Sequence, residues 1–319
     1  MRYRQLGRSG LTVSVVGLGC NNLGRTLDVA ATRKLLDAAL DEGVTFLDVA
    51  DAYGGHPGQS EEVLGEALSG RADEVVLGTK FGNDMRGANG PDWGARGSRR
   101  YVRRAVEASL RRLRVDHVDL YQYHRPDGIT PVEETLAALD ELVAEGKIRY
   151  AGSSNLTAWE VARADHVARE TGTVRFVSAQ NELSLLDRRA STELTDAAEA
   201  YGVGLLPYFP LANGLLTGKY TRDEEPPAGT RIAERKRALW EQAPWDTIER
   251  LSAYAAERGV TLLDVAVGGL AAQRAVASVI AGATSAEQLR ANVRAGDWRP
   301  TEEDLDVLDD IVPPGTRLI

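Results

Sequence analysis

The stretch from Thr45 to Tyr53 holds the side chains best suited to chemistry in this sequence of 319 residues. Its apolar residues predict a short buried strand, and Asp48 interrupts that strand. A carboxylate inside a buried strand is costly unless a cation or a hydrogen-bond donor pairs with it. Asp48 therefore needs a partner, and Asp51 and Tyr53 follow close behind it in the chain.

Lys80, at the end of the next apolar run, is the partner that we expect for Asp48. The lysine would also lie near Tyr53, and a cation about 4 Å away at an effective dielectric of ~20 is worth about 4 kcal/mol. Such a cation would lower a tyrosine pKa of ~10 by up to roughly three units, and Asp48 would offset part of that drop. We therefore expect a smaller net decrease in the pKa of Tyr53, which suits a general acid near neutral pH.

Polar residues also end the apolar runs that follow, namely His124, Ser153, Ser154, Asn155, Gln180 and Asn181. Each residue alone has an ordinary structural explanation, such as a satisfied core histidine for His124 or a surface lysine for Lys80. Together they suit the transfer of a proton from Tyr53 to a carbonyl oxygen whose carbon receives a hydride. His124 would orient that oxygen or pass a proton.

Eight short apolar runs alternate with helical patterns, at Val13–Gly19, Thr45–Ala50, Val75–Lys80, Val118–His124, Tyr150–Asn155, Phe176–Asn181, Val203–Tyr208 and Ala277–Ala283. The alternation predicts an α/β fold, a parallel (β/α)8 TIM barrel in one domain over residues 1–319. We also expect an N-terminal hairpin, Tyr3–Leu6 with Leu11–Ser14, on the barrel floor, and extra C-terminal helices. An open doubly wound sheet is the alternative, but no Gly-x-Gly-x-x-Gly follows the first run.

Several helix ends carry recognisable signals. Ser60 predicts an N-cap, and Thr130–Glu133 and Thr157–Glu160 predict capping boxes. Arg99–Arg114 predicts a helix with one apolar stripe, whose arginines form a solvated face.

Two long segments, Phe81–Gly97 and Leu211–Arg231, read as loops after the third and seventh strands. Loops of that length in a compact domain are usually functional. In a barrel both would lie on the C-terminal face, where active sites occur.

Composition excludes several classes of protein. The formal charge of −9 argues against a general nucleic-acid binder. The single cysteine, Cys20, rules out a disulfide framework, and we expect a small apolar residue there rather than a redox site. The N-terminus has no secretion signal and no run of about 18 apolar residues exists, so we expect a soluble, cytoplasmic protein without a membrane span. The four histidines show no paired spacing for a metal site.

Six motifs resemble a known family in their order and spacing: Gly43–Gly54, Ser60–Gly65, Thr79–Phe81, Asp119–His124, Gly152–Asn155 and Gly214–Tyr220. The chain resembles, over essentially its whole length, the aldo-keto reductases, which are barrel-shaped, nicotinamide-dependent carbonyl reductases. The resemblance implies a catalytic tetrad of Asp48, Tyr53, Lys80 and His124. It implies that the tyrosine donates a proton with help from the lysine and aspartate, while the histidine orients the carbonyl.

The same resemblance implies a set of cofactor contacts. Those at the nicotinamide end would be Cys20, Asn21, Asp48, Ser154, Asn155, Gln180 and Tyr208, with Tyr208 stacking on the ring. Those at the pyrophosphate would be Phe209, Pro210, Leu211, Ala212, Gly214, Thr217, Lys219 and Arg231. Those at the adenosine 2′-phosphate would be Gly282, Thr284, Gln288 and Asn292.

A helix start supports the last group of contacts. Ser285 and Gln288 predict a capping box, and a helix N-terminus at a barrel mouth binds anions through its free N–H groups. An ordinary capped helix is the alternative. The cap alone does not identify the anion; the family resemblance implies that it is the adenosine 2′-phosphate.

The chain departs from the family pattern near the phosphates. Ala283 and Thr284 stand where many members have a basic residue, and Ala291 replaces a frequent acidic one. Phe209 replaces a common serine, which removes a hydroxyl but no backbone donor. Arg231 or Arg290 would compensate for the missing cation. NADP(H) is therefore the favoured cofactor, and NAD(H) remains open.

Three functions fit the sequence. The first is an NAD(P)H-dependent oxidoreductase that reduces an aldehyde or a ketone to an alcohol. The second is an NAD(P)-dependent sugar or alcohol dehydrogenase that works in the oxidative direction. The third is a cofactor-sensing regulatory subunit resembling potassium channel beta subunits; the complete tetrad and the lack of an N-terminal extension favour an enzyme instead. Trp93, Tyr208 and Phe209 predict an apolar-walled pocket for a small carbonyl or alcohol, and no feature identifies the substrate or the oligomeric state.

Overall fold

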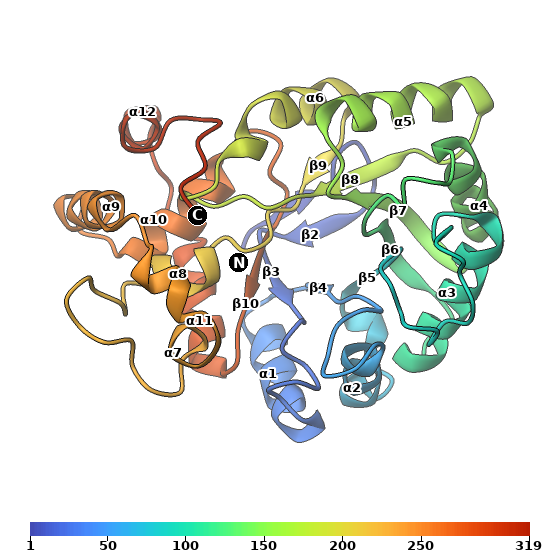
Figure 1. Ribbon diagram of the computed structural model, residues 1–319, viewed down its shortest axis with the longest axis horizontal. Coiled ribbons are helices and arrows are strands. Elements are labelled where there is room, and N and C mark those ends of the chain that lie inside the picture. Colours follow the sequence, from blue (N-terminus) through green and yellow to red (C-terminus); the bar gives the residue numbers. More distant parts are fainter.

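Eight parallel strands ringed by helices form a barrel in the computed structural model, which describes residues 1–319 (Figure 1). Neighbouring strands follow the order β10 (Val279–Gly282), β3 (Val16–Gly19), β4 (Phe46–Asp48), β5 (Val76–Phe81), β6 (Val118–Tyr123), β7 (Ile148–Ser154), β8 (Phe176–Gln180) and β9 (Gly204–Leu205). Two parallel bridges, Leu205 with Val276 and Tyr208 with Ile280, join β9 to β10 and close the ring. The predicted (β/α)8 barrel is confirmed.

The N-terminal hairpin closes one end of the barrel. β1 (Tyr3–Gln5) pairs antiparallel with β2 (Thr12–Ser14), as predicted. Leu6, Leu11 and Val13 are buried in one apolar cluster with strand residues such as Phe46 and Leu120. The hairpin therefore fills the floor of the barrel and leaves the opposite end for the site.

Side chains alternate between the inside and the outside of the barrel wall. Lys80 of β5 lies opposite Gln122 of β6, and both reach Asp48 in the interior. Their chain neighbours Thr79 and Tyr121 also lie opposite each other and point outward, to the layer of helices. Adjacent residues of one strand thus take part in two separate sets of contacts.

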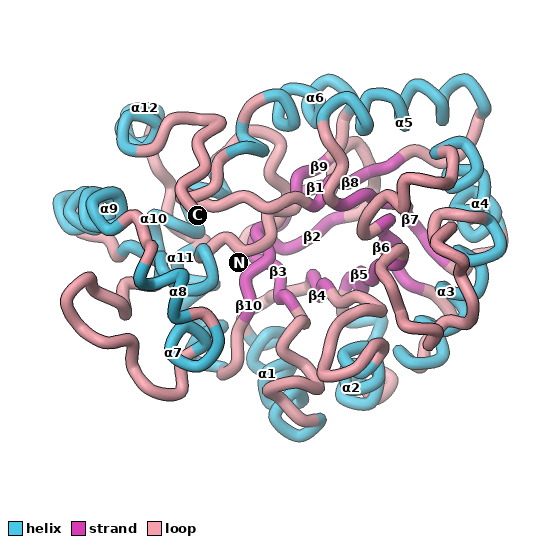
Figure 2. Tube along the Cα trace, in the orientation of Figure 1, coloured by secondary structure: helices cyan, strands magenta, loops and turns pink.

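Helices cover the outside of the barrel and extend it on one side (Figure 2). Those around the ring are α1 (Val29–Asp41), α2 (Gln59–Leu68), α3 (Arg99–Leu113), α4 (Val132–Ala144), α5 (Ala158–Thr171), α6 (Glu193–Tyr201), α10 (Leu262–Ala272) and α11 (Ala286–Ala295). The additional helices are α7 (Arg231–Arg235), α8 (Arg237–Glu241), α9 (Trp245–Glu257) and α12 (Glu302–Ile311). A second apolar cluster, which includes Trp245, Ile248 and Leu251, packs this extension against α10. Three 3₁₀ turns, η1 (Ala72–Glu74), η2 (Arg189–Ser191) and η3 (Ala212–Thr217), complete the elements.

The predicted helix caps were partly right. Thr157 and Glu160 form the expected capping box at α5. The box predicted at Thr130 is wrong, because α4 starts after Pro131 without a side-chain cap and the Thr130 hydroxyl binds Asp127 instead. Ser60 does not cap α2 either; Gly58 holds that position and Ser60 is buried in the first turn.

Two further expectations need correction. The segment after β9 is not a plain loop, because η3 lies within it and α7 begins at its end. The arginines of α3 do not all lie on a solvated face: the Arg112 side chain is only 13% exposed and pairs with the fully buried Glu61 at 2.7 Å. A charge that the helical pattern placed in solvent is thus held between α2 and α3 by a buried carboxylate.

Candidate active site

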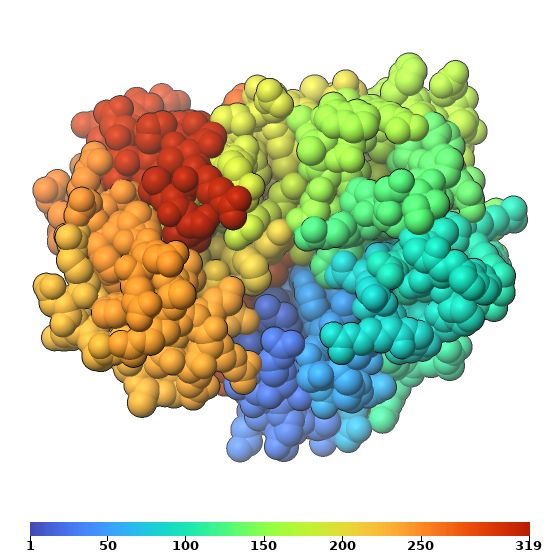
Figure 3. Space-filling view, in the orientation of Figure 1, coloured from blue at the N-terminus to red at the C-terminus, as the bar shows by residue number.

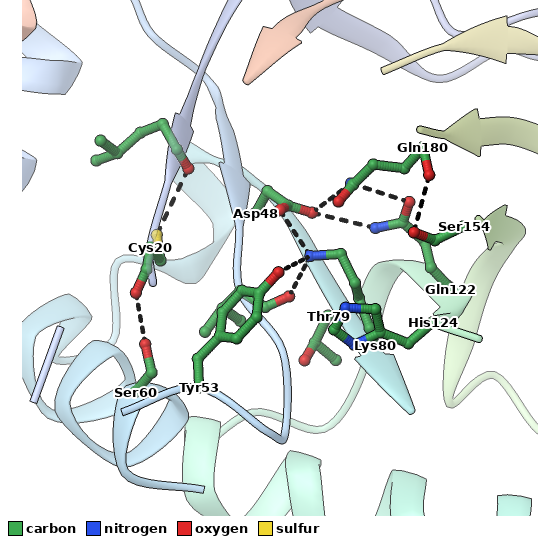
Figure 4. Close-up of polar contacts among 12 residues, drawn as sticks. Cys20, Asp48, Tyr53, Ser60, Thr79, Lys80, Gln122, His124, Ser154 and Gln180 are labelled. Carbon is green, nitrogen blue, oxygen red and sulfur yellow. Dashed lines mark hydrogen bonds and ion pairs between the residues drawn. The ribbon is translucent and has the colours of Figure 1, made fainter. Parts of the chain in front are cut away.

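The buried carboxylate of Asp48 pairs with the buried amine of Lys80 inside the barrel (Figure 4). The Nζ–Oδ2 distance is 2.6 Å, and the predicted pair is therefore present. Lys80 Nζ also donates to the backbone oxygen of Val49 at 3.0 Å and lies 3.3 Å from Tyr53 Oη. One ammonium group thus connects the carboxylate to the phenol.

Two glutamine amides complete the environment of Asp48. Gln180 Nε2 donates to Asp48 Oδ1 at 2.9 Å, and Gln122 Nε2 donates to the same oxygen at 3.1 Å. Gln122 was missed in the sequence, although its inward position on β6, two residues before His124, was readable from the alternation of that strand. With both oxygens bonded, the carboxylate is held in one orientation.

The pKa of Tyr53 is raised, and the expected decrease is wrong. Burial of the phenol raises it most; the charge of Lys80 lowers it, and Asp48 raises it again. The two neighbouring charges are readable from the sequence, but the desolvation of the phenolate is not, and it has the larger effect. Tyr53 therefore stays a phenol at neutral pH and holds a proton that it can donate.

Lys80 stays charged in this buried site. Burial alone would lower its pKa, but the Asp48 carboxylate, together with Tyr53, raises it above its ordinary value. A buried cation next to a phenol favours the phenolate once the proton has left. Lys80 therefore offsets part of the free-energy cost of forming a buried Tyr53 phenolate.

His124 lies at the end of β6, edge-on to the Tyr53 ring, with ring centroids 5.7 Å apart. Burial, with smaller effects of Lys80 and Arg125, holds its pKa well below the ordinary value, so the imidazole is neutral. Asn83 Nδ2 lies 3.0 Å from its Nδ1. If the Asn83 amide donates to Nδ1, the proton of the ring is on Nε2.

Asn83 belongs to the long segment after β5 and was also missed in the sequence. No residue pattern in that glycine-rich segment distinguishes it from other loop asparagines. Its side chain lies next to His124, whose N–H donates to Phe81 O across β5 and β6 at 2.7 Å.

The residues expected around the nicotinamide lie beside this cluster. Asn155 has φ +59° and donates from Nδ2 to the backbone oxygen of His124 at 3.0 Å, while Tyr208 Oη donates to Asn155 Oδ1 at 2.8 Å. Ser154 Oγ donates to the Gln180 backbone at 2.8 Å. Strands β7 to β9 thus connect to the tetrad through a continuous set of hydrogen bonds.

The chain after β9 turns sharply beside Tyr208. Phe209, Ala212 and Asn213 all have positive φ, as does Gly214 at +109°. The Phe209 ring packs edge-on against Tyr208, with centroids 5.1 Å apart. Thr217 Oγ1 donates to Gly214 O at 2.7 Å, and Lys219 lies over the ring of Tyr220. The segment Phe209–Lys219 is therefore a folded turn with its own internal contacts.

Arg231 follows that turn and lies half-buried among like charges. Burial lowers its pKa most, and Arg25 and Arg235 lower it further. None of these three arginines has a carboxylate within ion-pair distance; the side chain of Arg25 donates only to Gly54 O, at 3.0 Å. Cations held together without counter-charges suit an anionic ligand. Arg290 was the other residue expected to replace the missing cation near the phosphates, but it is paired with Glu42 at 3.1 Å.

The start of α11 differs slightly from the capping box that we expected. Ser285 is the N-cap and accepts from Gln288 N at 3.2 Å. The Gln288 side chain does not bond Ser285 but the residue before it: its Oε1 accepts from Thr284 N at 2.9 Å and from the Thr284 hydroxyl at 3.0 Å. Asn292 donates to Gly282 O at 3.3 Å. The four residues expected at the 2′-phosphate are thus neighbours.

Comparison with known proteins gives the family. The profile of the "Aldo/keto reductase family" matches residues 15–313. This chain belongs to the aldo/keto reductase family. A Bacillus subtilis (strain 168) protein named "Uncharacterized oxidoreductase YrpG" is 36% identical over 99% of this chain and 97% of its own length.

Two other relatives of this chain carry different names. "Probable voltage-gated potassium channel subunit beta" of Oryza sativa subsp. japonica is 36% identical over 98% of this chain and 97% of its own length. "L-glyceraldehyde 3-phosphate reductase" of Escherichia coli (strain K12) is 34% identical over 92% of this chain and 87% of its own length. The family therefore includes relatives named as oxidoreductases and relatives named as channel subunits.

Cys20 is fully buried. Its thiol donates weakly to Leu18 O at 3.5 Å, and Ser60 Oγ donates to its backbone oxygen at 2.6 Å. Burial raises the pKa of the thiol, so the sulfur is not a reactive thiolate. Asn21, the next residue, is only partly buried.

The surface of the protein is hollowed near the centre of the face shown in Figure 3, between the blue N-terminal segments and the yellow-to-orange segments that follow β9. No group of three or more His, Cys, Asp and Glu side chains is arranged to hold a metal ion. None of the helices has the length and apolar composition needed to cross a membrane.

Proposed function

We propose that this protein is an NADPH-dependent reductase that converts an aldehyde or a ketone to an alcohol, with Tyr53 as the proton donor. The observation that carries the proposal is the contact between the Tyr53 phenol and Lys80 Nζ at 3.3 Å, with Lys80 in turn paired to the buried Asp48. A phenol that stays protonated, beside a cation that favours its conjugate base, is suited to give up a proton in a transition state.

Each member of the tetrad then has a distinct role. Bound NADPH supplies a hydride to the carbonyl carbon. Tyr53 donates its proton to the carbonyl oxygen, and Lys80 stabilises the phenolate that remains. Asp48, held by two glutamines, fixes the lysine. His124 donates from Nε2 to the same oxygen and orients the carbonyl toward Tyr53.

NADPH is favoured over NADH because three arginines lie close together without counter-charges, two of them after β9. Arg231, Arg25 and Arg235 have no carboxylate partners, so an anion would relieve their repulsion. The phosphates of the cofactor are such anions, and NADPH carries one more than NADH. The orienting contacts for the nicotinamide would come from Ser154, Asn155 and Tyr208, which line the tetrad.

A second candidate function is a cofactor-binding regulatory subunit. The 36% identity to the rice protein named as a channel beta subunit favours it. The neutral His124 beside Tyr53 favours turnover instead, since that site has both a donor and a group to orient the substrate. Working in the oxidative direction on an alcohol would use the same residues in reverse.

The test is the variant Tyr53→Phe, assayed with NADPH and a panel of aldehydes and ketones. We expect kcat to fall by about 10²- to 10⁴-fold, with the Kd for NADPH within about twofold of wild type, because the hydroxyl acts only in proton transfer. Tyr3→Phe, at an exposed tyrosine, is the matched control. Full turnover by Tyr53→Phe would overturn the mechanism, and wild-type protein that binds NADPH but reduces nothing would favour the regulatory function.

A further inference from the structure

A second buried polar cluster lies on the outer side of the barrel wall, behind the tetrad. We call it the outer network; its members are Asp51, Glu61, Thr79, Asn89, Tyr101, Arg112 and Tyr121. They come from five parts of the chain: the segment after β4, α2, β5 with the loop that follows it, α3 and β6. None of these residues takes part in the proposed proton transfer.

Hydrogen bonds connect all members of the outer network except Tyr121. Thr79 Oγ1 donates to Glu61 Oε1 at 2.6 Å, and Arg112 Nε donates to Glu61 Oε2 at 2.7 Å. Arg112 Nη1 then donates to Asn89 Oδ1 at 3.1 Å. Asn89 Nδ2 in turn donates to Asp51 Oδ2 at 2.9 Å. The chain of contacts therefore ends on Asp51.

Asp51 is fully buried and lies in a region that already contains a paired charge. Its Oδ1 has no hydrogen-bond partner, and neither has the buried hydroxyl of Tyr121. Burial and the nearby Glu61 raise the pKa of Asp51 well above its ordinary value, against smaller opposing effects of Arg112 and Asn89. Since Glu61 and Arg112 neutralise each other, an ionised Asp51 would leave one uncompensated buried charge. Burial and the neighbouring Glu61 therefore favour the neutral, protonated form of Asp51.

The backbone of Asp51 bonds both to β5 and to the residues that follow Tyr53. Its N–H donates to the backbone oxygen of Lys80 at 3.2 Å, and its own oxygen accepts from Gly58 N at 2.6 Å. Tyr53 follows two residues later, and its N–H and oxygen bond Ala50 and Ser60. The position of Asp51 thus affects the turn that aims the Tyr53 phenol at Lys80.

We propose that Asp51 is a positioning residue for the reaction: through Asn89 and the Glu61–Arg112 pair, the outer network holds the segment Val49–Ser60 so that the Tyr53 hydroxyl stays next to Lys80. The inference rests on the proposed function of Tyr53. It extends that function to residues that contact neither the substrate nor the cofactor. A misplacement of about 1 Å is enough to lower a rate by roughly a hundredfold.

The experiment compares Asp51→Asn with Asp51→Ala, using NADPH and 4-nitrobenzaldehyde as the probe substrate. Asparagine keeps the shape and the neutral charge, so we expect Asp51→Asn to retain kcat within about threefold of wild type. Asp51→Ala should lower kcat by about tenfold to a hundredfold with the Kd for NADPH within about twofold, because the phenol is displaced while the cofactor contacts remain. Asp84→Ala, an exposed carboxylate in the same loop as Asn89, is the control and should match wild type.

Hydrogen exchange gives a readout that does not depend on turnover. We expect faster amide exchange in the segment Val49–Ser60 for Asp51→Ala and wild-type exchange for Asp51→Asn. If Asp51→Ala does not fold, Asn89→Ala replaces it, since that change breaks the same chain of contacts one step earlier. Unchanged kcat or unchanged exchange in the alanine variant would overturn the proposal, as would an asparagine variant as slow as the alanine one.

The two proposals fail in different ways. If Tyr53→Phe keeps its activity, or if the wild type reduces no carbonyl, the proposed function fails and the exchange data still test the outer network. If Tyr53→Phe is inactive while Asp51→Ala is fully active, the positioning role fails and the proposed function stands.

Discussion

The side-chain amide of Asn83 lies 3.0 Å from Nδ1 of His124, on the side of the imidazole away from Nε2. A donor at that position keeps Nδ1 as an acceptor and the ring proton on Nε2. The residue thus decides what His124 can offer to a carbonyl oxygen.

We therefore expect two different effects from substituting Asn83. Asn83→Leu removes the donor and frees the tautomer, which should lower kcat by about tenfold. Asn83→Asp introduces an acceptor that favours a proton on Nδ1, and should lower kcat further, toward a hundredfold. Steady-state kinetics with NADPH and a saturating aldehyde measure both. Asp84→Asn, at the neighbouring exposed residue, should leave kcat unchanged, and equal rates for all three variants would contradict the assignment.

Removing Asp48 should destabilise the protein as well as slow it. Lys80 is fully buried, and without Asp48 Oδ2 at 2.6 Å it keeps a charge that lacks a carboxylate partner. Breaking a buried ion pair in this way costs about 3–5 kcal/mol. We expect that loss in the free energy of unfolding of Asp48→Ala, measured in urea. Asp37→Ala, at an exposed carboxylate that binds Arg71, should lose less than about 1 kcal/mol.

The stability of the protein should depend on pH through His124. Burial holds its pKa in the folded protein well below 6.5, whereas in the unfolded chain it titrates at ~6.5. Below that pH the unfolded state binds a proton that the folded state does not, so the stability present above ~6.5 is lost as the pH falls toward the folded value. The slope contributed is at most about 1.4 kcal/mol per pH unit.

Unfolding titrations at pH 7.5 and 5.5 test this dependence. We expect His124→Asn to lose less stability between these values than the wild type does, because asparagine takes up no proton. His166→Asn, at an exposed histidine of α5, should retain the wild-type difference. If the stability of His124→Asn changed with pH as much as that of the wild type, other groups would cause the pH dependence.

Arg231 and Arg290 should differ in their effect on cofactor binding. Arg231 has no carboxylate partner, so Arg231→Ala should weaken the binding of NADPH by about tenfold, or 1.4 kcal/mol. Arg290 is already paired with Glu42, so Arg290→Ala should change the Kd by less than about twofold. Fluorescence titrations of the wild type and both variants with NADPH and with NADH measure these dissociation constants. If Arg290→Ala weakened NADPH binding more than Arg231→Ala does, Arg290 and not Arg231 would be the residue that binds the cofactor phosphates.

The sequence was sufficient for the barrel because its signal is repeated. Eight apolar runs and the helical patterns between them agree with one another, and the hairpin Tyr3–Ser14 has its own turn signal. Pairing between Asp48 and Lys80 was also predictable, since a buried carboxylate requires a partner and few cations lie at strand ends. The one-domain organisation, the cytoplasmic location and the cofactor contacts stay predictions.

The errors came from quantities that depend on three-dimensional burial. The pKa of Tyr53 could not be judged from its charged neighbours, because the desolvation of the phenol outweighs them. Arg112 looked like its solvated neighbours in α3 because its partner, Glu61, is 51 residues away in sequence. Asn83 lies in a loop whose path the residue pattern does not determine.

Strand β5 places Thr79 and Lys80 on opposite sides of the barrel wall, and both side chains end in buried bonds. A shift of β5 by one residue against β4 and β6 would turn Lys80 to the outside of the barrel. Asp48 would then face Thr79 or Phe81, depending on the direction of the shift, and neither residue can supply a cation. A single slip would thus break the hydrogen bonds of both networks at once. Contacts in the barrel interior and in the helical layer therefore both favour the same pairing of β5 with its neighbours.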